Sequence, residues 1–365
     1  MATQMSLRDL RRSVGQLVIA GFDGHDIPLE TRAMAREFDL GGVIYFARNV
    51  ASPEQVAELS RTSRALARET PLWISVDQEG GRVARLRRPF TEWPPMNTLG
   101  RSGDERLAER FARALARELR AVGINLDYAP VLDIHTNPKN PVIGDRAFAE
   151  KADDVARFAT IVIRALQDEG IAACGKHFPG HGDTSTDSHH ELPVLEHAPD
   201  RFDRVELVPF RAAIEAQVAS IMTAHVLVPS IDADRPATLS SRIVDGILKK
   251  KLGYQGIVIS DDLDMKAISA TWSPGDSMIA AIAAGCDAVL LCAPKPDEQC
   301  EALEAVIHAV ESHELSMKRV EDAIARGQRM KARFLAGRQQ AAPALADVLG
   351  SSEHQAIAEE MAAFR

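Results

Sequence analysis

Eight short apolar runs alternate with longer segments of helical period, and this alternation constrains the fold more than any other feature of the sequence. The runs span residues 16–22, 41–46, 72–77, 124–134, 171–178, 219–226, 256–263 and 288–293. Most are nearly continuous in Val, Ile, Leu and Ala, as expected of parallel strands that are buried on both faces. Eight such strands alternating with helices predict an α/β protein with a single (β/α)8 barrel of the TIM type. A doubly wound open sheet is the alternative, but no run is followed by the glycine-rich loop that binds dinucleotides.

The segments between the runs carry helix signals. Ser52, Pro53 and Gln55 match an N-cap serine, a proline at the first helical position and a capping-box glutamine. Two further segments have an apolar face that ends at a glycine, at residues 107, 111, 115 and 119 before Gly123 and at residues 155, 158, 162 and 166 before Gly170. We expect residues 1–340 to form one catalytic barrel. Residues 341–365 are rich in alanine, and we expect a C-terminal tail there that is helical or partly disordered.

Composition and charge limit the partners and the location. The net charge of -9, from 43 basic and 52 acidic residues, argues against a nucleic-acid partner. No stretch approaches the ~20 apolar residues that a membrane helix needs, so we expect no membrane partner. Residues 1–12 are polar and rich in arginine, which is not typical of a secretory signal. The cysteines Cys174, Cys286, Cys292 and Cys300 form no C-x-x-C pair, so we expect a cytoplasmic protein, and we expect a monomer.

Polar residues collect where the predicted strands end. In a barrel these ends meet at one face, which is where catalytic side chains lie. The residues are Asp77 after the third run, Asp145 and Arg146 after the fourth, Lys176 and His177 in the fifth, His225 in the sixth, and Asp261 and Asp262 in the seventh. Charged groups at the ends of apolar strands are costly unless they face a polar cavity. A ring of donors around the acceptor Asp77 suits a substrate rich in hydroxyl groups.

Two features of this set favour nucleophilic and proton-transfer chemistry. Asp261 ends an apolar strand, where a carboxylate is a well-fixed nucleophile, although capping of the next helix is a competing role for an aspartate here, which Asp262 or Asp264 can supply. In loop 178–193, Asp187 precedes His189 by two residues. In an extended segment the two side chains point to the same side, so the carboxylate can hold the imidazole in one tautomer for proton transfer. A solvated polar loop is the competing interpretation.

Three other functions remain open on the same residues. A metal hydrolase would draw its ligands from a set of histidines and an aspartate: His177, His181, Asp183, His189, His190 and His225. Against it, His177 and His181 flank a Phe-Pro-Gly segment and are not a helical pair, and the first run lacks the H-x-H of metal-dependent barrel hydrolases. A Schiff-base lyase would use Lys176 with a lowered pKa. A binding protein would not need both a nucleophile-like carboxylate and an Asp–His pair.

Four longer motifs add a resemblance to a known family. VDQEGGRVARL, VIGDRAF, KHFPGHGDTSTDSH and ISDDLDM occur in this order. Together they resemble glycoside hydrolase family 3, and more closely its single-domain bacterial β-N-acetylglucosaminidases of peptidoglycan recycling. The resemblance covers about residues 17–293, which is nearly the whole predicted barrel.

The resemblance implies a role for each matching residue. Asp261 would be the nucleophile that forms a covalent glycosyl-enzyme, His189 the general acid/base, and Asp187 its carboxylate partner. The residues that hold the terminal sugar would be Asp77, Arg85, Arg146, Lys176 and His177. Glu79 is a rival acid and His190 a rival proton carrier. Asp264 and Ala147 stand where relatives often have serine, and neither is expected to carry chemistry.

The implied function is that of a retaining exo-β-N-acetylglucosaminidase. It would remove GlcNAc from GlcNAc-β-1,4-anhydroMurNAc and its peptides, with no metal and no organic cofactor. Its partner would be this small sugar substrate. A glycoside phosphorylase on the same fold is the nearest alternative, because a histidine does not repel incoming phosphate as a carboxylate does.

Overall fold

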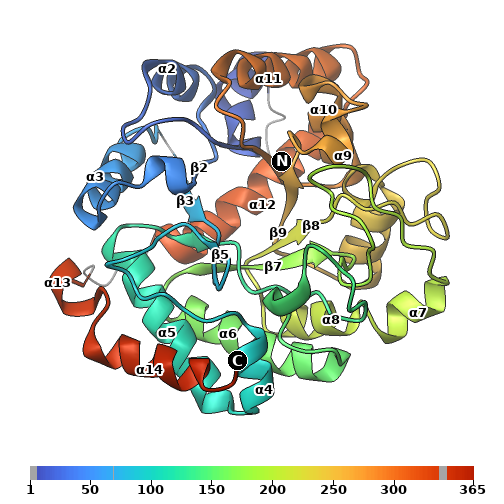
Figure 1. The fold of residues 1–365 in the computed structure, drawn as a ribbon. Helices are drawn as coiled ribbons and strands as arrows, with labels where there is room; N and C mark the ends of the chain where they lie inside the picture. The colour runs from blue at the N-terminus through green and yellow to red at the C-terminus, as the bar shows by residue number, and fades with distance from the viewer. Residues whose placement is uncertain (1–5, 69, 337–342) are drawn as a thin grey trace.

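Eight parallel strands form the centre of the molecule. The computed structural model of the protein describes residues 6–68, 70–336 and 343–365. The barrel strands are β1 (Val18–Ala20), β2 (Gly42–Tyr45), β3 (Trp73–Val76), β6 (Leu126–Asp127), β7 (Ala172–Phe178), β8 (Ser220–Thr223), β9 (Ile257–Asp262) and β10 (Ala288–Leu291). They close in the order β1-β10-β9-β8-β7-β6-β3-β2. Figure 1 shows the labelled strands of this barrel at the centre of the molecule. The predicted α/β class and TIM-type barrel are confirmed.

Helices surround this barrel. They are α1 (Leu7–Ser13), α2 (Leu29–Phe38), α3 (Pro53–Arg64), α4 (Asn97–Ser102), α5 (Glu105–Ala121), α6 (Ala152–Asp168), α7 (Pro199–Arg204), α8 (Val208–Glu215), α9 (Lys266–Ser269), α10 (Pro274–Ala284), α11 (Pro296–Glu311), α12 (Met317–Leu335), α13 (Leu345–Val348) and α14 (Ser352–Ala362). Short 3-10 turns are η1 (Val14–Leu17), η2 (Ala47–Asn49), η3 (Gly144–Arg146) and η4 (Ala237–Leu239), and η5 (Arg242–Lys251) is a π-helix. Ser52 accepts from the Gln55 N–H, and Gly123 and Gly170 follow their helices with positive φ, as predicted. The predicted capping box is wrong in its second half, because the Gln55 side chain accepts from the Ala51 N–H and not from that of Ser52.

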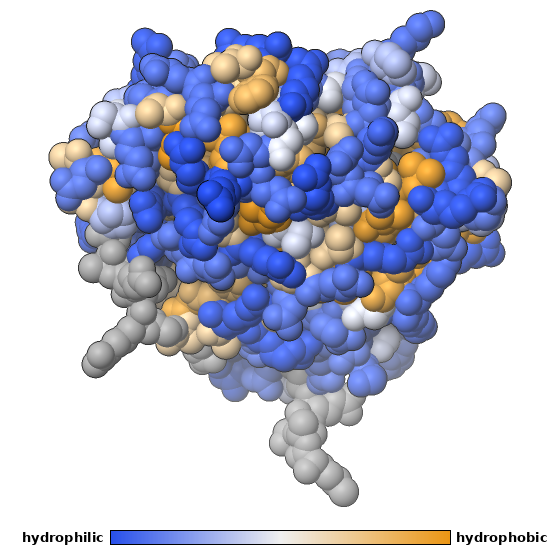
Figure 2. All heavy atoms as spheres, turned by 90° about the horizontal axis from the view of Figure 1, so that it is seen from below, coloured by the Kyte–Doolittle hydropathy of each residue, from blue (hydrophilic) through white to orange (hydrophobic). Residues whose placement is uncertain are grey.

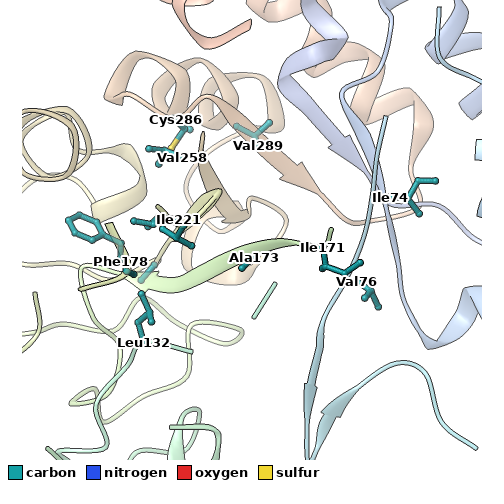
Figure 3. Close-up of a cluster of buried hydrophobic side chains, with 14 of the residues drawn as sticks. Ile74, Val76, Leu132, Ile171, Ala173, Phe178, Ile221, Val258, Cys286 and Val289 are labelled. Carbon is teal, nitrogen blue, oxygen red and sulfur yellow. The ribbon is translucent and has the colours of Figure 1, made fainter. Parts of the chain in front are cut away.

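Two apolar layers separate the inside of the barrel from its surroundings. Side chains such as Trp73, Cys174 and Ile259 point inward and form one buried cluster. The alternate positions point outward between strands and helices, and Figure 3 shows several of these outward side chains, including Val76 and Val258. Successive side chains of a strand point to opposite faces. This alternation decides which residues at the strand ends face the inside of the barrel.

The two ends of the barrel differ. α12 crosses one end, and its Met330 and Phe334 pack against the inward-facing cluster (Figure 1). Phe46, which follows β2, packs against the same cluster and lines the pocket at the carboxyl ends of the strands. The hairpin of β4 (Gln78–Gly80) and β5 (Val83–Ala84) follows β3 directly at that side. The pocket end is therefore the open one.

The C-terminal segment lies against the outside of the barrel. α14 runs beside α4 and α5 in Figure 1, with Ile357 and Met361 buried. The predicted boundary at residues 340 and 341 lies outside the described residues. The outer face in Figure 2 is mostly hydrophilic, with hydrophobic side chains in small separate groups. Among the described helices, none combines the length and the apolar character that crossing a bilayer requires.

The observed strands are shorter than the apolar runs that predicted them. The fourth run, 124–134, pairs regularly only at Leu126 and Asp127, because Pro130 has no N–H to donate to a neighbouring strand. A single bridge between Val131 and Lys176 continues the pairing beyond it. The residues after this bridge are free to leave the barrel wall, and they reach the site as a loop.

Candidate active site

Strand parity brings three predicted residues into the barrel opening. Trp73 faces inward on β3, and Asp77 lies four residues later at the end of the same strand. Lys176 follows Cys174 on β7 by two residues, and Asp261 follows Ile259 on β9 by two. All three therefore continue the inward-facing side of a strand beyond the apolar core.

A pocket of about 520 Å³ opens at this end of the barrel. Seven of the eight predicted site residues line it: Asp77, Arg85, Arg146, Lys176, His177, His189 and Asp261. The eighth, Asp187, contacts His189. The residues come from the ends of four strands, β3, β6, β7 and β9, and their loops, and the structure brings them to one place.

Asp77 forms the charged wall of the pocket with two cations. Its Oδ1 accepts from Lys176 Nζ at 2.7 Å, and its Oδ2 accepts from Arg85 Nη2 at 3.2 Å. Burial alone would raise the pKa of Asp77, but Lys176 and Arg85 outweigh it and hold the pKa below its ordinary value. The Nε of Arg85 is buried and has no hydrogen-bond partner within the described part of the chain.

Glu79 lies behind this wall and does not have the environment of an acid. Its oxygens accept from Arg146 Nε and Nη2 at 2.9 and 2.8 Å, and Lys176 Nζ is 2.6 Å from Oε1. Burial would raise the pKa of Glu79, yet the two cations hold it well below its usual range. A carboxyl group that stays ionised has no proton to donate. The structure places Glu79 as a counter-ion behind the wall, on the β4–β5 hairpin.

Asp133 is a site residue that the sequence analysis missed. It is buried, and its Oδ2 lies 2.7 Å from His177 Nδ1 while its Oδ1 accepts the His181 N–H at 2.6 Å. Burial would raise the pKa of Asp133, but His177 lowers it below the ordinary value. Because the pair fixes the His177 ring, the Nε2 of His177 is left for the pocket. The apolar run 124–134 contains two acids, Asp127 and Asp133, and such charged residues inside an apolar run were the available signal.

Asp261 stands at the pocket end of β9, and its neighbours are held by backbone groups. Its Oδ1 accepts from the Asp262 N–H at 2.8 Å. Asp262 in turn accepts from the N–H groups of Asp264 and Cys292, so neither aspartate caps a helix as the alternative supposed. Burial and then the nearby Asp264 raise the pKa of Asp262 to about 7. Asp264 lines the pocket, where its Oδ2 accepts from the Ala293 N–H.

The predicted Asp–His pair is present. His189 Nδ1 lies 2.7 Å from Asp187 Oδ1, and the His189 N–H donates to the same oxygen at 2.8 Å. The His190 N–H donates to the Asp187 carbonyl, so the pair lies in a turn. The prediction of an extended segment here is wrong. Burial would raise the pKa of Asp187, but its bonds with His189 lower it. His190 is exposed, and within the described part of the chain no side-chain hydrogen bond joins it to Asp187.

The residues of the rival functions have other partners. His225 is buried and bonded to Thr238 and to the Asp262 carbonyl, and His181 is bonded to Thr184 and Ser188. Within the ranges that the structure describes, no three His, Cys, Asp or Glu side chains gather as a metal would require. Burial would lower the pKa of Lys176, but Asp77 and Glu79 raise it above the ordinary value. The prediction of a lowered pKa for Lys176, which a Schiff-base lysine needs, is therefore wrong.

A TIM barrel with a carboxylate at a strand end and a carboxylate-held histidine across a pocket defines a class of protein, the barrel glycoside hydrolases. Known proteins agree with this class. The β-hexosaminidase A of Pseudoalteromonas piscicida is 34% identical over 365 residues, and the chain spans 60% of that relative's length and 92% of its own. The β-hexosaminidase of Stenotrophomonas maltophilia (strain K279a) is 38% identical over 317 residues, or 85% of this chain and 92% of the relative.

A solved structure and a family match agree with these relatives. A glycoside hydrolase family 3 β-N-acetylglucosaminidase from Paenibacillus sp. str. FPU-7 has a TM-score of 0.93 and 44% identity, covering 97% of this chain and 68% of that chain. Residues 9–330 match the family described as "Glycosyl hydrolase family 3 N terminal domain". The chain belongs to glycoside hydrolase family 3, and it is a glycoside hydrolase of the β-hexosaminidase type.

Proposed function

We propose that the protein is a retaining exo-β-N-acetylglucosaminidase that releases terminal GlcNAc from GlcNAc-β-1,4-anhydroMurNAc and its peptides. The observation that carries the proposal is that Asp261 and the Asp187-held His189 border one pocket. The names of the relatives support an N-acetylhexosamine as the sugar. The muropeptide substrate rests on the resemblance of the sequence motifs.

In this proposal His189 and Asp261 share two steps. First, an Asp261 oxygen bonds to the anomeric carbon while the glycosidic C–O bond breaks, and the His189 Nε2 proton passes to the leaving oxygen. Second, His189 Nε2 takes a proton from water, whose oxygen attacks the anomeric carbon as the bond to Asp261 breaks. Asp187 accepts the Nδ1–H throughout, which directs Nε2 toward the reacting oxygen.

The charged wall would bind the sugar in the same scheme. Asp77 keeps its charge and can accept from sugar hydroxyls. Arg85 and His177 line the pocket, and Asp133 holds the His177 ring through Nδ1, which leaves Nε2 to bond a sugar hydroxyl. Arg146 and Lys176 are fixed by Glu79, so they would define the inner end of the pocket. The proposal also places the enzyme in the cytoplasm as a monomer, and Cys174, Cys286, Cys292 and Cys300 are free thiols, as a reducing compartment requires.

A substrate comparison tests the sugar assignment. Aryl β-N-acetylglucosaminide and aryl β-glucoside are hydrolysed with and without EDTA, and with and without phosphate. We expect preference for the acetamido sugar, no effect of EDTA and no sugar 1-phosphate. Preference for the glucoside would contradict the assignment of N-acetylglucosamine. Loss of activity with EDTA would favour the metal hydrolase, and release of sugar 1-phosphate would favour the phosphorylase. Comparing the muropeptide disaccharide with chitobiose then tests the aglycone.

Stereochemistry and variants test the mechanism. NMR of the first product should show the β-anomer, and a first α-anomer would contradict retention. Asp261→Ala should be almost inactive on all substrates. His189→Ala should lose about 100-fold or more in kcat/KM with a poor leaving group and much less with a nitrophenyl leaving group, because general acid catalysis matters less when the leaving group needs no proton. Equal losses on both would contradict the acid/base role.

A further inference from the structure

The loop that carries His189 has one buried residue between two outward ones. The His189 side chain is 61% exposed and that of Asp187 is 28% exposed, whereas Ser188 between them is 2% exposed. Ser188 also lines the pocket. A small polar residue that turns inward between two outward ones acts as an attachment point, provided that its hydroxyl has a fixed partner.

His181 is that partner. Its Nε2 lies 3.2 Å from Ser188 Oγ, and its Nδ1 lies 2.8 Å from Thr184 Oγ1. Both ends of the segment between Thr184 and Ser188 are thus bonded to one imidazole. His181 is buried, and burial lowers its pKa to about 4, so the ring is neutral and offers one donor and one acceptor.

The hydrogen bonds around this ring form a consistent set. Thr184 Oγ1 donates to the His181 carbonyl at 3.1 Å, which leaves its lone pairs to accept from His181 Nδ1–H. The Nε2 lone pair then accepts from the Ser188 hydroxyl. His181 is itself fixed, because its N–H donates to the buried Asp133 that also holds His177. The chain of contacts runs from the barrel wall to the loop.

Ser188 is tied to the other side of the pocket through its backbone. Its carbonyl accepts from the Ala267 N–H at 3.2 Å, in the segment that follows β9. β9 carries Asp261 at its end. Ser188 therefore joins the element that bears the proposed acid/base to the element that bears the proposed nucleophile.

We propose that Ser188 and His181 are positioning residues that hold His189 in register with Asp261. The inference rests on the proposed function, in which His189 is the general acid/base. Neither side chain transfers a proton itself. Their hydrogen bond fixes the backbone on which His189 is carried, and a displacement of about 1 Å of a catalytic group can cost about 100-fold in rate.

Ser188→Ala tests the inference, since it removes one hydroxyl and should leave the fold intact. The matched control is Ser185→Ala, in the same loop, where the serine is exposed and makes no side-chain hydrogen bond among the described residues. We expect Ser188→Ala to lower kcat/KM about ten-fold on an alkyl or disaccharide leaving group and clearly less on a nitrophenyl leaving group. Ser185→Ala should match the wild type in activity and melting temperature, and Ser188→Ala should keep one cooperative unfolding transition, lowered only by the loss of one buried hydrogen bond.

His189→Ala, measured in parallel, separates this inference from the proposed function. If His189→Ala shows the leaving-group dependence and Ser188→Ala behaves like Ser185→Ala, the positioning role is wrong and the function stands. If His189→Ala shows no such dependence, the proposed function fails. Equal losses of Ser188→Ala on both substrates indicate general damage and overturn the inference.

A double-mutant cycle tests the pair directly. His181→Gln combined with Ser188→Ala should lose no more than His181→Gln alone, because the two residues act through one bond. Additive losses would show that they act separately and would overturn the pairing. Should His181→Gln fail to fold, the Ser188→Ala comparison still decides the question.

Discussion

Glu79, behind the charged wall, has a less exposed side chain than Asp77, and its environment decides its role. Its side chain is 2% exposed and contacts Arg146 and Lys176, whose side chains are 10% and 2% exposed. Three charges out of water are tolerated because each has an opposite partner. Removing the one carboxylate that joins Arg146 and Lys176 leaves excess positive charge behind the wall. The site therefore depends on Glu79 although it transfers no proton.

Glu79→Gln separates this role from acid catalysis. Breaking a buried pair on one side costs about 3 kcal/mol or more, so the variant should be clearly less stable to urea than the wild type. Its kcat/KM should fall by the same factor on poor and good leaving groups, since the wall affects sugar binding and not protonation. Glu92→Gln, at an exposed pair with Arg88, is the control and should change little. A loss confined to poor leaving groups would restore Glu79 as the acid.

At the residue scale, side chains adjacent to strand ends were predictable and their long-range partners were not. Asp77, Lys176 and Asp261 follow from strand parity, which sequence carries. The contact of Asp133 with His177 spans 44 residues, and that of Glu79 with Arg146 spans 67. No local period encodes such separations, because a loop's path depends on packing of the whole barrel.

Among the elements, α12 has a part beyond covering the barrel. Beside the apolar residues that close the barrel end, it buries Lys331, which is 2% exposed and donates to Gln16 Oε1 at 2.7 Å. Gln16 also donates to Asp39, so the lysine connects α12 to the turn before β2. Burial lowers the pKa of Lys331 from 10.5 to about 7, and Asp39 opposes this only in part.

Lys331→Met should change the pH dependence of stability. The unfolded state binds a proton at Lys331 below about pH 10.5 and the folded state only below about pH 7, so this lysine costs stability that is regained as pH rises through that window. The free energy of unfolding of Lys331→Met minus that of the wild type should therefore be largest near pH 7. This difference should decline toward about pH 10, by up to about 1.4 kcal/mol per pH unit.

Urea unfolding at several pH values measures this difference. Lys318→Met, at an exposed position of the same helix, is the control and should give a difference that does not vary with pH. A pH-independent difference for Lys331→Met would mean that the lysine is charged in the folded state.

At the scale of elements, the alternation of strands and helices could be predicted from hydrophobic period and helix caps. The burial of Lys331 could not, because the period of α12 does not show that this helix crosses the end of the barrel.

In the molecule as a whole, one carboxylate joins three distant segments. Glu118 of α5 is 2% exposed, and it accepts from Thr91 and from the N–H of Gly350, while His354 Nδ1 lies 3.0 Å from its Oε1. The loop after the β4–β5 hairpin, the helix layer and the C-terminal segment meet there. The sequence predicts a helical or partly disordered tail, and nothing in the tail's own composition indicates this contact, because the acceptor lies 232 residues away from Gly350.

Glu118→Ala should therefore destabilise the whole fold and not only the tail. It leaves several buried donors without an acceptor, each costing about 1–3 kcal/mol, so we expect a loss of at least about 3 kcal/mol in one cooperative transition. Glu109→Ala is the control, because it lies on the same helix in an exposed pair with Arg113 and should cost at most about 1 kcal/mol. Calorimetry and limited proteolysis together show whether the loss of stability is confined to the C-terminal segment or affects the whole fold. If proteolysis removes residues 343–365 from the Glu118→Ala variant while its melting temperature stays that of the control, the C-terminal segment is a separable attachment; a single lowered transition means that it is part of the barrel's cooperative unit.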